Sequence, residues 1–350
     1  MKRTLALILS AVLLLGLLAG CQTAEPSQTT AATTEPAPTQ SPEEQEVLKI
    51  LTIGNSHSSD ATRLLYEVFQ KEAPEQKVVL GTLYYSGCNM AQHACFSASD
   101  AAVYEYYKND SGIWKTVKEA TMRMALLDEQ WDIVITQQMN HRVGIDDNYV
   151  AKDYQDVIDY IQFYVKKPYD LAFHITWTNP DDYAPYLNDD SPLKNPDPKS
   201  WRTQHESWYG GADGKYDQNQ MYKKVIEKVQ KYLIDTTEFL GENYFDMMIS
   251  SVTAVEYAQD VCGMAQNQMY RDYTHLSDYG RLLVAYQWYA QLMGMEKIET
   301  VKVDALPANL HQDKSMYPAM PDYTITQEMK DVIIQSVNWT LAHPYELPAK

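Results

Sequence analysis

Five short apolar runs alternate with segments of helical periodicity, and this alternation limits the folds that are open to the chain. We predict strands at residues 48–53, 78–84, 131–136, 171–176 and 244–249. Where strands alternate with helices of about 10–15 residues, each helix connects two parallel strands. The sequence therefore predicts an α/β protein with a mostly parallel, five-stranded sheet. In such a sheet ligands bind beyond the carboxyl ends of the strands, so the residues that follow each strand are the candidates for function.

The predicted helices carry apolar residues at every third or fourth position. Ser58, Ser59 and Asp60 are candidate N-caps for the first helix, which continues to Phe69. The same periodicity predicts further helices at residues 114–127, 154–165, 221–233, 277–293 and 326–341.

The first twenty residues have the pattern of a secretory signal. A basic start, Met1-Lys-Arg, precedes an apolar run that is too short for a comfortable membrane span. Residues 18–21, LAGC, resemble a bacterial lipobox. This resemblance implies cleavage before Cys21, lipidation of its sulfur, and a place in the bacterial cell envelope, anchored to a membrane and facing outside the cytoplasm. A plain secreted protein with an incidental cysteine is the alternative.

The predicted domain organisation follows from a change in composition. Residues 21–46 are rich in Thr, Ala, Pro and Glu and contain no aromatic residue, so they cannot bury enough surface to offset chain entropy. We predict a disordered tether there, a folded domain at 47–300, and a C-terminal extension at 301–350 that packs on the same domain.

The charge balance excludes some partners. With 29 Lys and Arg against 47 Asp and Glu, the formal net charge is −18. Binding to nucleic-acid phosphates or to anionic lipid needs clustered Lys and Arg. The excess of acidic residues therefore argues against a nucleic-acid partner and against electrostatic docking on a membrane. Tyrosine supplies 27 residues, which suits either a polar binding surface or ordinary packing.

The cysteine and histidine pattern predicts neither a metal nor a nucleotide cofactor. The chain has no CxxC, HExxH, P-loop or EF-hand motif. Besides Cys21, the cysteines are Cys88, Cys95 and Cys262, and three cannot all pair within the chain. A Cys88–Cys95 bridge is one possibility, and the sequence leaves the pairing open.

A long polar stretch between Thr178 and Gln220 is too long for an ordinary connector. This stretch is either a lid over a binding site or a surface loop that its aromatic residues hold against the domain. The aromatic residues are Tyr183, Tyr186, Trp201, Trp208 and Tyr209.

Two short motifs carry residues suited to nucleophilic catalysis. Gly54-Asn55-Ser56 follows the first strand, where a sharp turn would expose a serine hydroxyl. In the late segment Asp272-Tyr-Thr-His275, the carboxylate can reach the imidazole and fix its tautomer. Taken singly, each residue is also explained as a turn, cap or loop residue.

Two further strand ends offer hydrogen-bond donors. Gly87 follows the second strand, where a backbone amide can approach a substrate oxygen, and Gln137 and Asn140 follow the third. His57, His141 and His174 lie at or near strand ends as well. They are candidates for substrate contact or simply polar residues with satisfied hydrogen bonds.

Together, GNS after the first strand, a glycine after the second, an amide residue after the third and the late DxxHLSxxG resemble the SGNH (GDSL-type) hydrolase family over about residues 47–295. The similarity is greatest to a branch with GNS in place of GDS. This resemblance implies a flavodoxin-like three-layer α/β/α sandwich. It makes Ser56 the nucleophile, His275 the general base and acid, and Asp272 the residue that orients His275.

The same resemblance implies an oxyanion hole formed by the amides of Ser56 and Gly87 and one side-chain amide. Gln137 fits the branch better, with Asn140 as the fallback, because the family's usual Gly-x-Asn-Asp is absent here. Asn55 stands where the family usually has Asp. This change indicates that the residue at position 55 supports the turn and does not transfer protons.

The function implied is a serine esterase that hydrolyses small acyl esters, notably acetyl esters of carbohydrate, without a cofactor. The natural substrate (a xylan-type polysaccharide, a host glycan or the cell's own envelope polymer) stays open, as does the oligomeric state. The alternatives are a non-catalytic glycan-binding lipoprotein on a degenerate SGNH fold and an acyltransferase on the same fold.

Overall fold

All five predicted strands are present in the computed structural model, which describes residues 46–181, 198–235, 237–306 and 323–348. They pair in parallel in the order β2-β1-β5-β6-β7, which in chain order is 2-1-3-4-5, the doubly wound arrangement of flavodoxin-like folds. Their bounds are β1 (Leu48–Gly54), β2 (Val78–Tyr84), β5 (Ile133–Gln137), β6 (Asp170–Ile175) and β7 (Met247–Ser250). The prediction of a mostly parallel sheet is confirmed.

The sheet has seven strands because an antiparallel hairpin extends one edge. β3 (Tyr104–Asn109) pairs with β2, and β4 (Trp114–Ala120) pairs with β3. The predicted helix at 114–127 is therefore wrong over its first half, and only α4 (Met122–Asp128) is helical there. Trp114, Val117 and Ala120 have helical spacing, but pairing with β3 decides the conformation.

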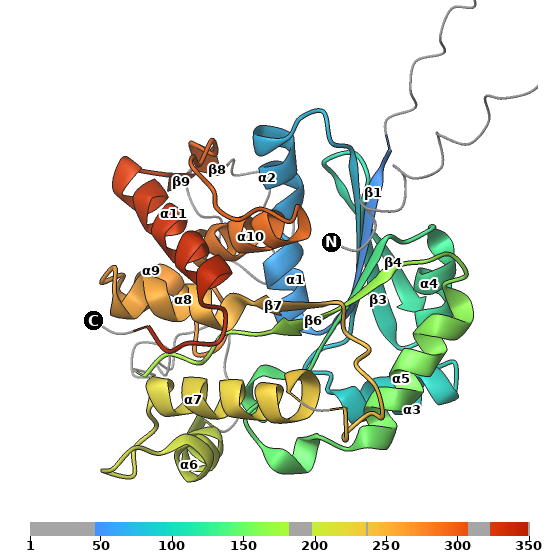
Figure 1. Cartoon of the computed structure of the whole chain (residues 1–350), viewed down its shortest axis with the longest axis horizontal. Helices are drawn as coiled ribbons and strands as arrows, with labels where there is room; N and C mark the ends of the chain where they lie inside the picture. Colours follow the sequence, from blue (N-terminus) through green and yellow to red (C-terminus); the bar gives the residue numbers. More distant parts are fainter. Residues whose placement is uncertain (1–45, 182–197, 236, 307–322, 349–350) are drawn as a thin grey trace, which may run out of the picture. The chain divides into compact units, whose positions relative to one another are not determined.

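Helices cover both faces of the sheet (Figure 1), which gives the predicted three-layer α/β/α sandwich. One layer contains α1 (Ser56–Thr62), α2 (Leu65–Glu72), α8 (Ser251–Asp260), α10 (Asp278–Leu292) and α11 (Gln327–Ala342). The opposite layer contains α3 (Met90–Ala98), α4, α5 (Ala151–Tyr164) and α7 (Gln218–Val229). The remaining α-helices and β-strands of the described residues are α6 (Pro198–Tyr209), α9 (Gln266–Met269), β8 (Ala305–Leu306) and β9 (Tyr323–Thr324).

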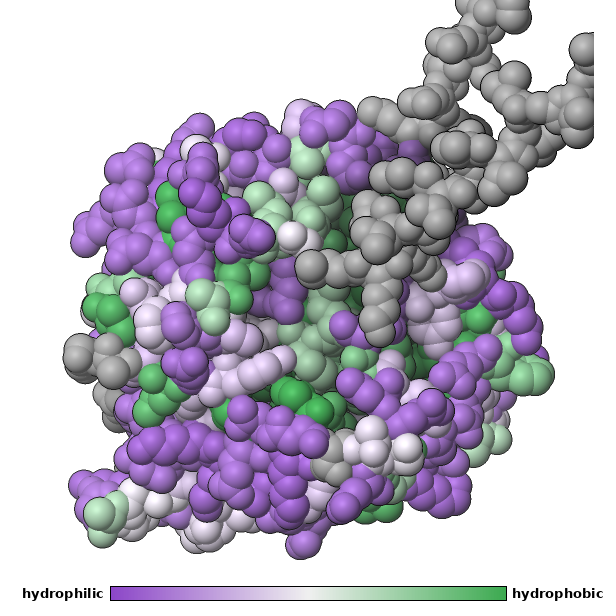
Figure 2. Space-filling model, viewed as in Figure 1, coloured by the Kyte–Doolittle hydropathy of each residue, from purple (hydrophilic) through white to green (hydrophobic). Residues whose placement is uncertain are grey.

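An apolar cluster fills the space on each side of the sheet. Helix α10 lies in the first cluster and is buried along almost its whole length, and α11 packs against both α8 and α10. Burying one large apolar side chain stabilises the fold by about 1.5–3 kcal/mol, so these layers supply most of the drive to fold. The surface in view in Figure 2 is mostly hydrophilic.

Some predictions fall outside the described residues. These are the signal at 1–20, the lipid attachment at Cys21, the tether up to residue 45, and Tyr183 and Tyr186 of the polar stretch. In the described part of that stretch, Trp208 and Tyr209 lie on α6, which packs against α7. No helix among the described residues is both long and apolar enough to span a membrane.

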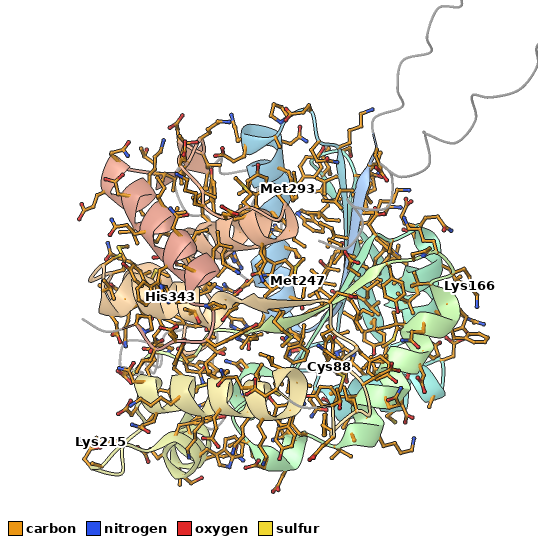
Figure 3. The ribbon with its side chains drawn as sticks, in the orientation of Figure 1. Cys88, Lys166, Lys215, Met247, Met293 and His343 are labelled. Atoms are coloured by element: carbon orange, nitrogen blue, oxygen red, sulfur yellow. The ribbon has the colours of Figure 1, made fainter. Side chains whose placement is uncertain are left out.

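The three described cysteines are free thiols. Cys88 is buried in the turn that follows β2 and is labelled in Figure 3, Cys95 is exposed, and Cys262 is half-buried. The Cys88–Cys95 bridge that the sequence left open is not formed.

Candidate active site

A cavity of about 860 Å³ opens where β1, β2 and β5 end. β1 and β5 are neighbours in the sheet, while their connections leave toward opposite faces, and ligands bind at such a switch point in open α/β sheets. The residues that line it come from the turns after these strands, from the hairpin β3–β4, and from the segment before α10.

Ser56 is the first residue of α1, and the turn before it is tight. The Asn55 side chain caps the helix by accepting a hydrogen bond from His57 N at 3.0 Å, and its amide donates to the Cys88 carbonyl at 2.9 Å. Gly54 has no room for a side chain, because a Cβ there would overlap Ser58 Oγ and lie 2.8 Å from Gln137 Cγ. Asn55 thus supports the turn, as the replacement of Asp by Asn had indicated. Ser56 is half-buried and lines the cavity.

Asp272 holds His275 by its Nδ1 atom. The two carboxylate oxygens lie 2.8 and 3.1 Å from Nδ1. Asp272 Oδ1 also accepts from the backbone N–H of Thr274 and of His275, at 2.9 and 2.7 Å. Burial raises the pKa of Asp272, but His275 and these other donors outweigh it and hold the pKa below its usual value. The pairing favours a proton on Nδ1, which leaves Nε2 with its lone pair.

Ser56 and His275 are 219 positions apart in the chain, and the structure brings both to the same cavity. Gly87 and Asn140 line it as well. Gly87 has φ +61°, in the left-handed region where glycine is favoured. Among the residues that the structure describes, no acceptor is present for the backbone N–H of Ser56 or of Gly87. Both amides therefore remain available to a ligand oxygen.

The two candidate side-chain amides differ in position. Gln137 is fully buried beneath the turn, where it accepts from Ser58 Oγ at 2.5 Å and donates to Asn55 Oδ1 at 2.7 Å. It does not line the cavity. Asn140 does, and its Nδ2 donates to Asn179 Oδ1 at 2.8 Å and to Thr274 Oγ1 at 3.0 Å. Of the two side-chain amides, Asn140 is therefore the one at the cavity.

Asp60, which we predicted only as a candidate helix cap, is a buried carboxylate that binds two arginines. Asp60 accepts from Arg271 and Leu276 N on one oxygen, at 2.8 and 3.1 Å, and from two nitrogens of Arg281 on the other, at 2.9 and 2.7 Å. Burial raises the pKa of Asp60, but Arg271 and Arg281 hold it well below its usual value.

These contacts join two parts of the site. Asp60 lies one helical turn after Ser56 on α1, and its partners flank His275 on both sides in the chain. The carboxylate therefore fixes the distance between the serine and the histidine segment. The signal in the sequence was Arg281, a cation in the helix that follows His275, because a charge that such a helix buries must be paired.

Neutral histidines surround the candidate triad. The His57 ring lies 4.5 Å from that of Trp177 and 5.8 Å from that of His275, and burial lowers its pKa to about 3. His141 and His205 also line the cavity, with ring centroids 5.5 Å apart. His174 does not line it and instead lies 3.0 Å from Ser251 Oγ. Among the described residues, no three His, Cys, Asp or Glu side chains are grouped so as to hold a metal ion.

We expect these histidines to make the protein acid-sensitive. Burial lowers the pKa of five of them, which are His57, His93, His141, His174 and His205. The unfolded chain then binds protons that the folded state does not, so stability is full above about pH 6.5 and falls below it. Each histidine contributes up to about 1.4 kcal/mol per pH unit.

Urea unfolding at pH 7, 6 and 5 measures this fall in the free energy of unfolding. His93→Gln, away from the cavity, is expected to make the fall shallower whatever its effect at pH 7. Equal free energies at pH 7 and pH 5 would contradict the expectation.

Comparison with known proteins finds a family model that matches part of the chain and a solved structure with a similar fold. Residues 49–189 match the model of a family described as Domain of unknown function (DUF4886). A DUF4886 family protein from Bacteroides uniformis superposes with a TM-score of 0.64 at 23% identity, over 87% of this chain and 98% of that one. No curated protein matches the sequence.

Two further solved structures overlap more weakly. One is a protein from Slackia heliotrinireducens described as a proposed SGNH hydrolase, with a TM-score of 0.42, 14% identity, and coverage of 71% of this chain and 100% of that one. The other is a gut microbial diltiazem-metabolizing enzyme, with a TM-score of 0.38, 9% identity, and coverage of 71% and 47%. Overlap at this level says nothing about activity. Residues 49–189 therefore carry the DUF4886 pattern, and the chain shares its fold with a protein of that family.

Proposed function

We propose that this protein is a serine esterase that hydrolyses small acyl esters, with Ser56 as nucleophile. The observation that carries the proposal is that Ser56 and His275 line one cavity while Asp272 Oδ2 lies 2.8 Å from His275 Nδ1. A serine, an imidazole with a free Nε2 and an orienting carboxylate are the parts of a nucleophilic triad.

The proposed reaction has two halves. Ser56 Oγ attacks the ester carbonyl and gives its proton to His275 Nε2, and the resulting imidazolium then protonates the departing alcohol. A water molecule next attacks the acyl-enzyme and loses a proton to Nε2. The Ser56–acyl bond then breaks, Nε2 returns the proton to Ser56 Oγ, and the acid is released. Asp272 keeps its negative charge throughout and stabilises the imidazolium.

The developing oxyanion needs donors that are already in place. The N–H groups of Ser56 and Gly87 are suited to this role, since both lie at the cavity without another acceptor among the described residues. Asn140 is the proposed third donor. Its Nδ2 would exchange Thr274 Oγ1 for the substrate oxygen.

Asn140→Ala is expected to lower kcat for an acetate ester by about 10²-fold, because one oxyanion donor is lost. Steady-state kinetics on 4-nitrophenyl acetate measure this. Asn148→Ala, a change of the same kind in a side chain that does not line the cavity, is the matched control and should leave kcat unchanged. An unchanged kcat in Asn140→Ala would remove this residue from the oxyanion hole.

The experiment that tests the function is hydrolysis of 4-nitrophenyl acetate together with labelling by a fluorophosphonate, which reacts with activated serines. We expect turnover, and a covalent adduct on the peptide that contains Ser56. Binding of a glycan without hydrolysis would favour the non-catalytic capture protein. Transfer of the acetyl group to an added sugar in preference to water would favour the acyltransferase.

We also propose that the enzyme is a lipoprotein anchored through Cys21 in the bacterial cell envelope. This rests on the sequence of residues 1–46. The tether would hold the catalytic domain away from the membrane surface.

A further inference from the structure

The hairpin β3–β4 forms one wall of the cavity, and nothing in the proposed triad uses it. Alternate residues of β3 face opposite sides of the sheet. Tyr104 and Tyr106 belong to the apolar core on one side, while Glu105 and Tyr107 line the cavity on the other. We call the cavity-facing residues of this region the hairpin wall; they are Tyr84, Glu105, Tyr107, Trp114, Thr116 and Lys118.

The hairpin wall is continuous with the turn that carries Ser56. Tyr84 is in register with Gly54 of β1, and Glu105 is in register with Tyr84. Thr82, on the same face of β2 as Tyr84, lies 3.0 Å from Thr62 of α1 through the two hydroxyl oxygens, so the wall and α1 share one side of the sheet. With neighbouring strands about 4.8 Å apart, β4 lies roughly 14 Å from β1.

The cavity is much larger than the acyl group requires. A water-sized group occupies about 30 Å³, so an acetyl group fills on the order of 100 Å³. The cavity measures about 860 Å³, so most of it is left for the alcohol part of the ester. Because β4 lies roughly 14 Å from β1, an acetyl group at Ser56 would not reach the outer strand of the wall, and the alcohol part would.

The chemistry of the wall fits a neutral sugar. Tyr84 and Tyr107, with ring centroids 5.8 Å apart, and Trp114 offer flat apolar faces. Glu105 and Lys118, 3.9 Å apart, offer an acceptor and a donor beside them. A pyranose ring has an apolar face of C–H groups and an edge of hydroxyls, and aromatic residues with a polar tip match both. A hydrocarbon tail would make no use of the charged pair, and a polyanion would meet a protein of charge −18.

We propose that the hairpin wall is a carbohydrate subsite, in which a neutral pyranose ring of the acylated alcohol stacks on Tyr107 while its hydroxyls bond to Glu105 and Lys118. The inference deepens the proposed esterase function and takes it as its starting point.

The test compares a substrate that reaches the wall with one that does not. Peracetylated xylobiose, cellobiose and chitobiose are the large substrates, and 4-nitrophenyl acetate is the small one. Tyr107→Ala is expected to lower kcat/KM for at least one disaccharide ester by about tenfold or more and to leave that for 4-nitrophenyl acetate unchanged. Tyr107→Phe, which keeps the ring, should retain most of the activity.

Val117→Ala is the matched control, because Val117 lies on the neighbouring strand, is 45% exposed, and does not line the cavity. It should behave as the wild type on every substrate. An equal loss on large and small substrates in Tyr107→Ala, or no loss on any disaccharide ester, would overturn the subsite.

A binding measurement separates this inference from the esterase. Titration calorimetry of Ser56→Ala with xylohexaose should show binding that Tyr107→Ala in the same background weakens about tenfold. If that holds while the wild type hydrolyses no ester, the sugar site stands and the esterase proposal fails. If esters are hydrolysed but neither the sugar nor the Tyr107 substitution has an effect, the esterase stands and the subsite fails.

Discussion

Replacing Ser56 or His275 with alanine is expected to lower kcat for 4-nitrophenyl acetate by about 10⁴-fold or more, because each removes a group that the acyl-transfer step needs. Groups that act as one unit are strongly non-additive. The double variant Ser56→Ala/His275→Ala should therefore be hardly worse than either single one. Steady-state kinetics, with active-site titration of the wild type, measure all three.

Ser59→Ala is the control for this experiment. Ser59 is half-buried on the same helix and lines the same cavity, so it tests whether any hydroxyl there matters. It should keep wild-type turnover. If Ser56→Ala keeps turnover as well, Ser56 is not the nucleophile.

Asp60→Asn is expected to lower both stability and turnover. Removing the charge leaves the buried Arg281 and the half-buried Arg271 without their shared partner, and breaking a buried ion pair of this kind costs about 3–5 kcal/mol in the free energy of unfolding. The low pKa of Asp60 contributes stability above the unfolded value, near pH 4, and this contribution is lost as the pH falls. The variant should therefore show a shallower decline in stability below pH 4.

The effect on turnover separates a positioning role from a merely structural one. At a temperature where both proteins are folded, kcat should fall about 10²-fold in Asp60→Asn with little change in KM, because the histidine segment loses its fixed distance from Ser56. Asp60→Glu should recover part of it. Asp156→Asn, which breaks an exposed pair with Lys152 on α5, is the control and should change neither quantity. A destabilised variant with full kcat would show that the network only holds the fold.

The parallel strands could be predicted because they are fully buried. A strand covered on both faces is a continuous apolar run, and each of the five runs became a strand within a few residues of its predicted bounds. The hairpin could not be predicted in the same way. Its residues alternate between the core and a polar cavity, and β4 is exposed along most of its length, so its sequence carries little strand signal.

The candidate site was predicted where its chemistry is local. Asp272 and His275 are three positions apart, and Asn55 is adjacent to Ser56, so spacing alone indicated their relation. Asp60 and Arg281 are separated by 221 positions, and only the packing of α1 against α10 brings them together. The choice between Gln137 and Asn140 likewise depends on which side chain the turn after β5 sends to the cavity, which no local pattern specifies.

The place of the hairpin at the sheet's edge makes it a replaceable part. Among the described strands, the hairpin pairs with the rest of the sheet through β2, and Tyr104, Tyr106 and Ala120 are its residues in the apolar core. A grafted hairpin that keeps these three residues but differs in its outer ones would redirect the proposed esterase to another alcohol without disturbing the parallel strands. The alcohol specificity of such proteins could then change through substitutions in one hairpin, while the proposed triad and its reaction stay the same.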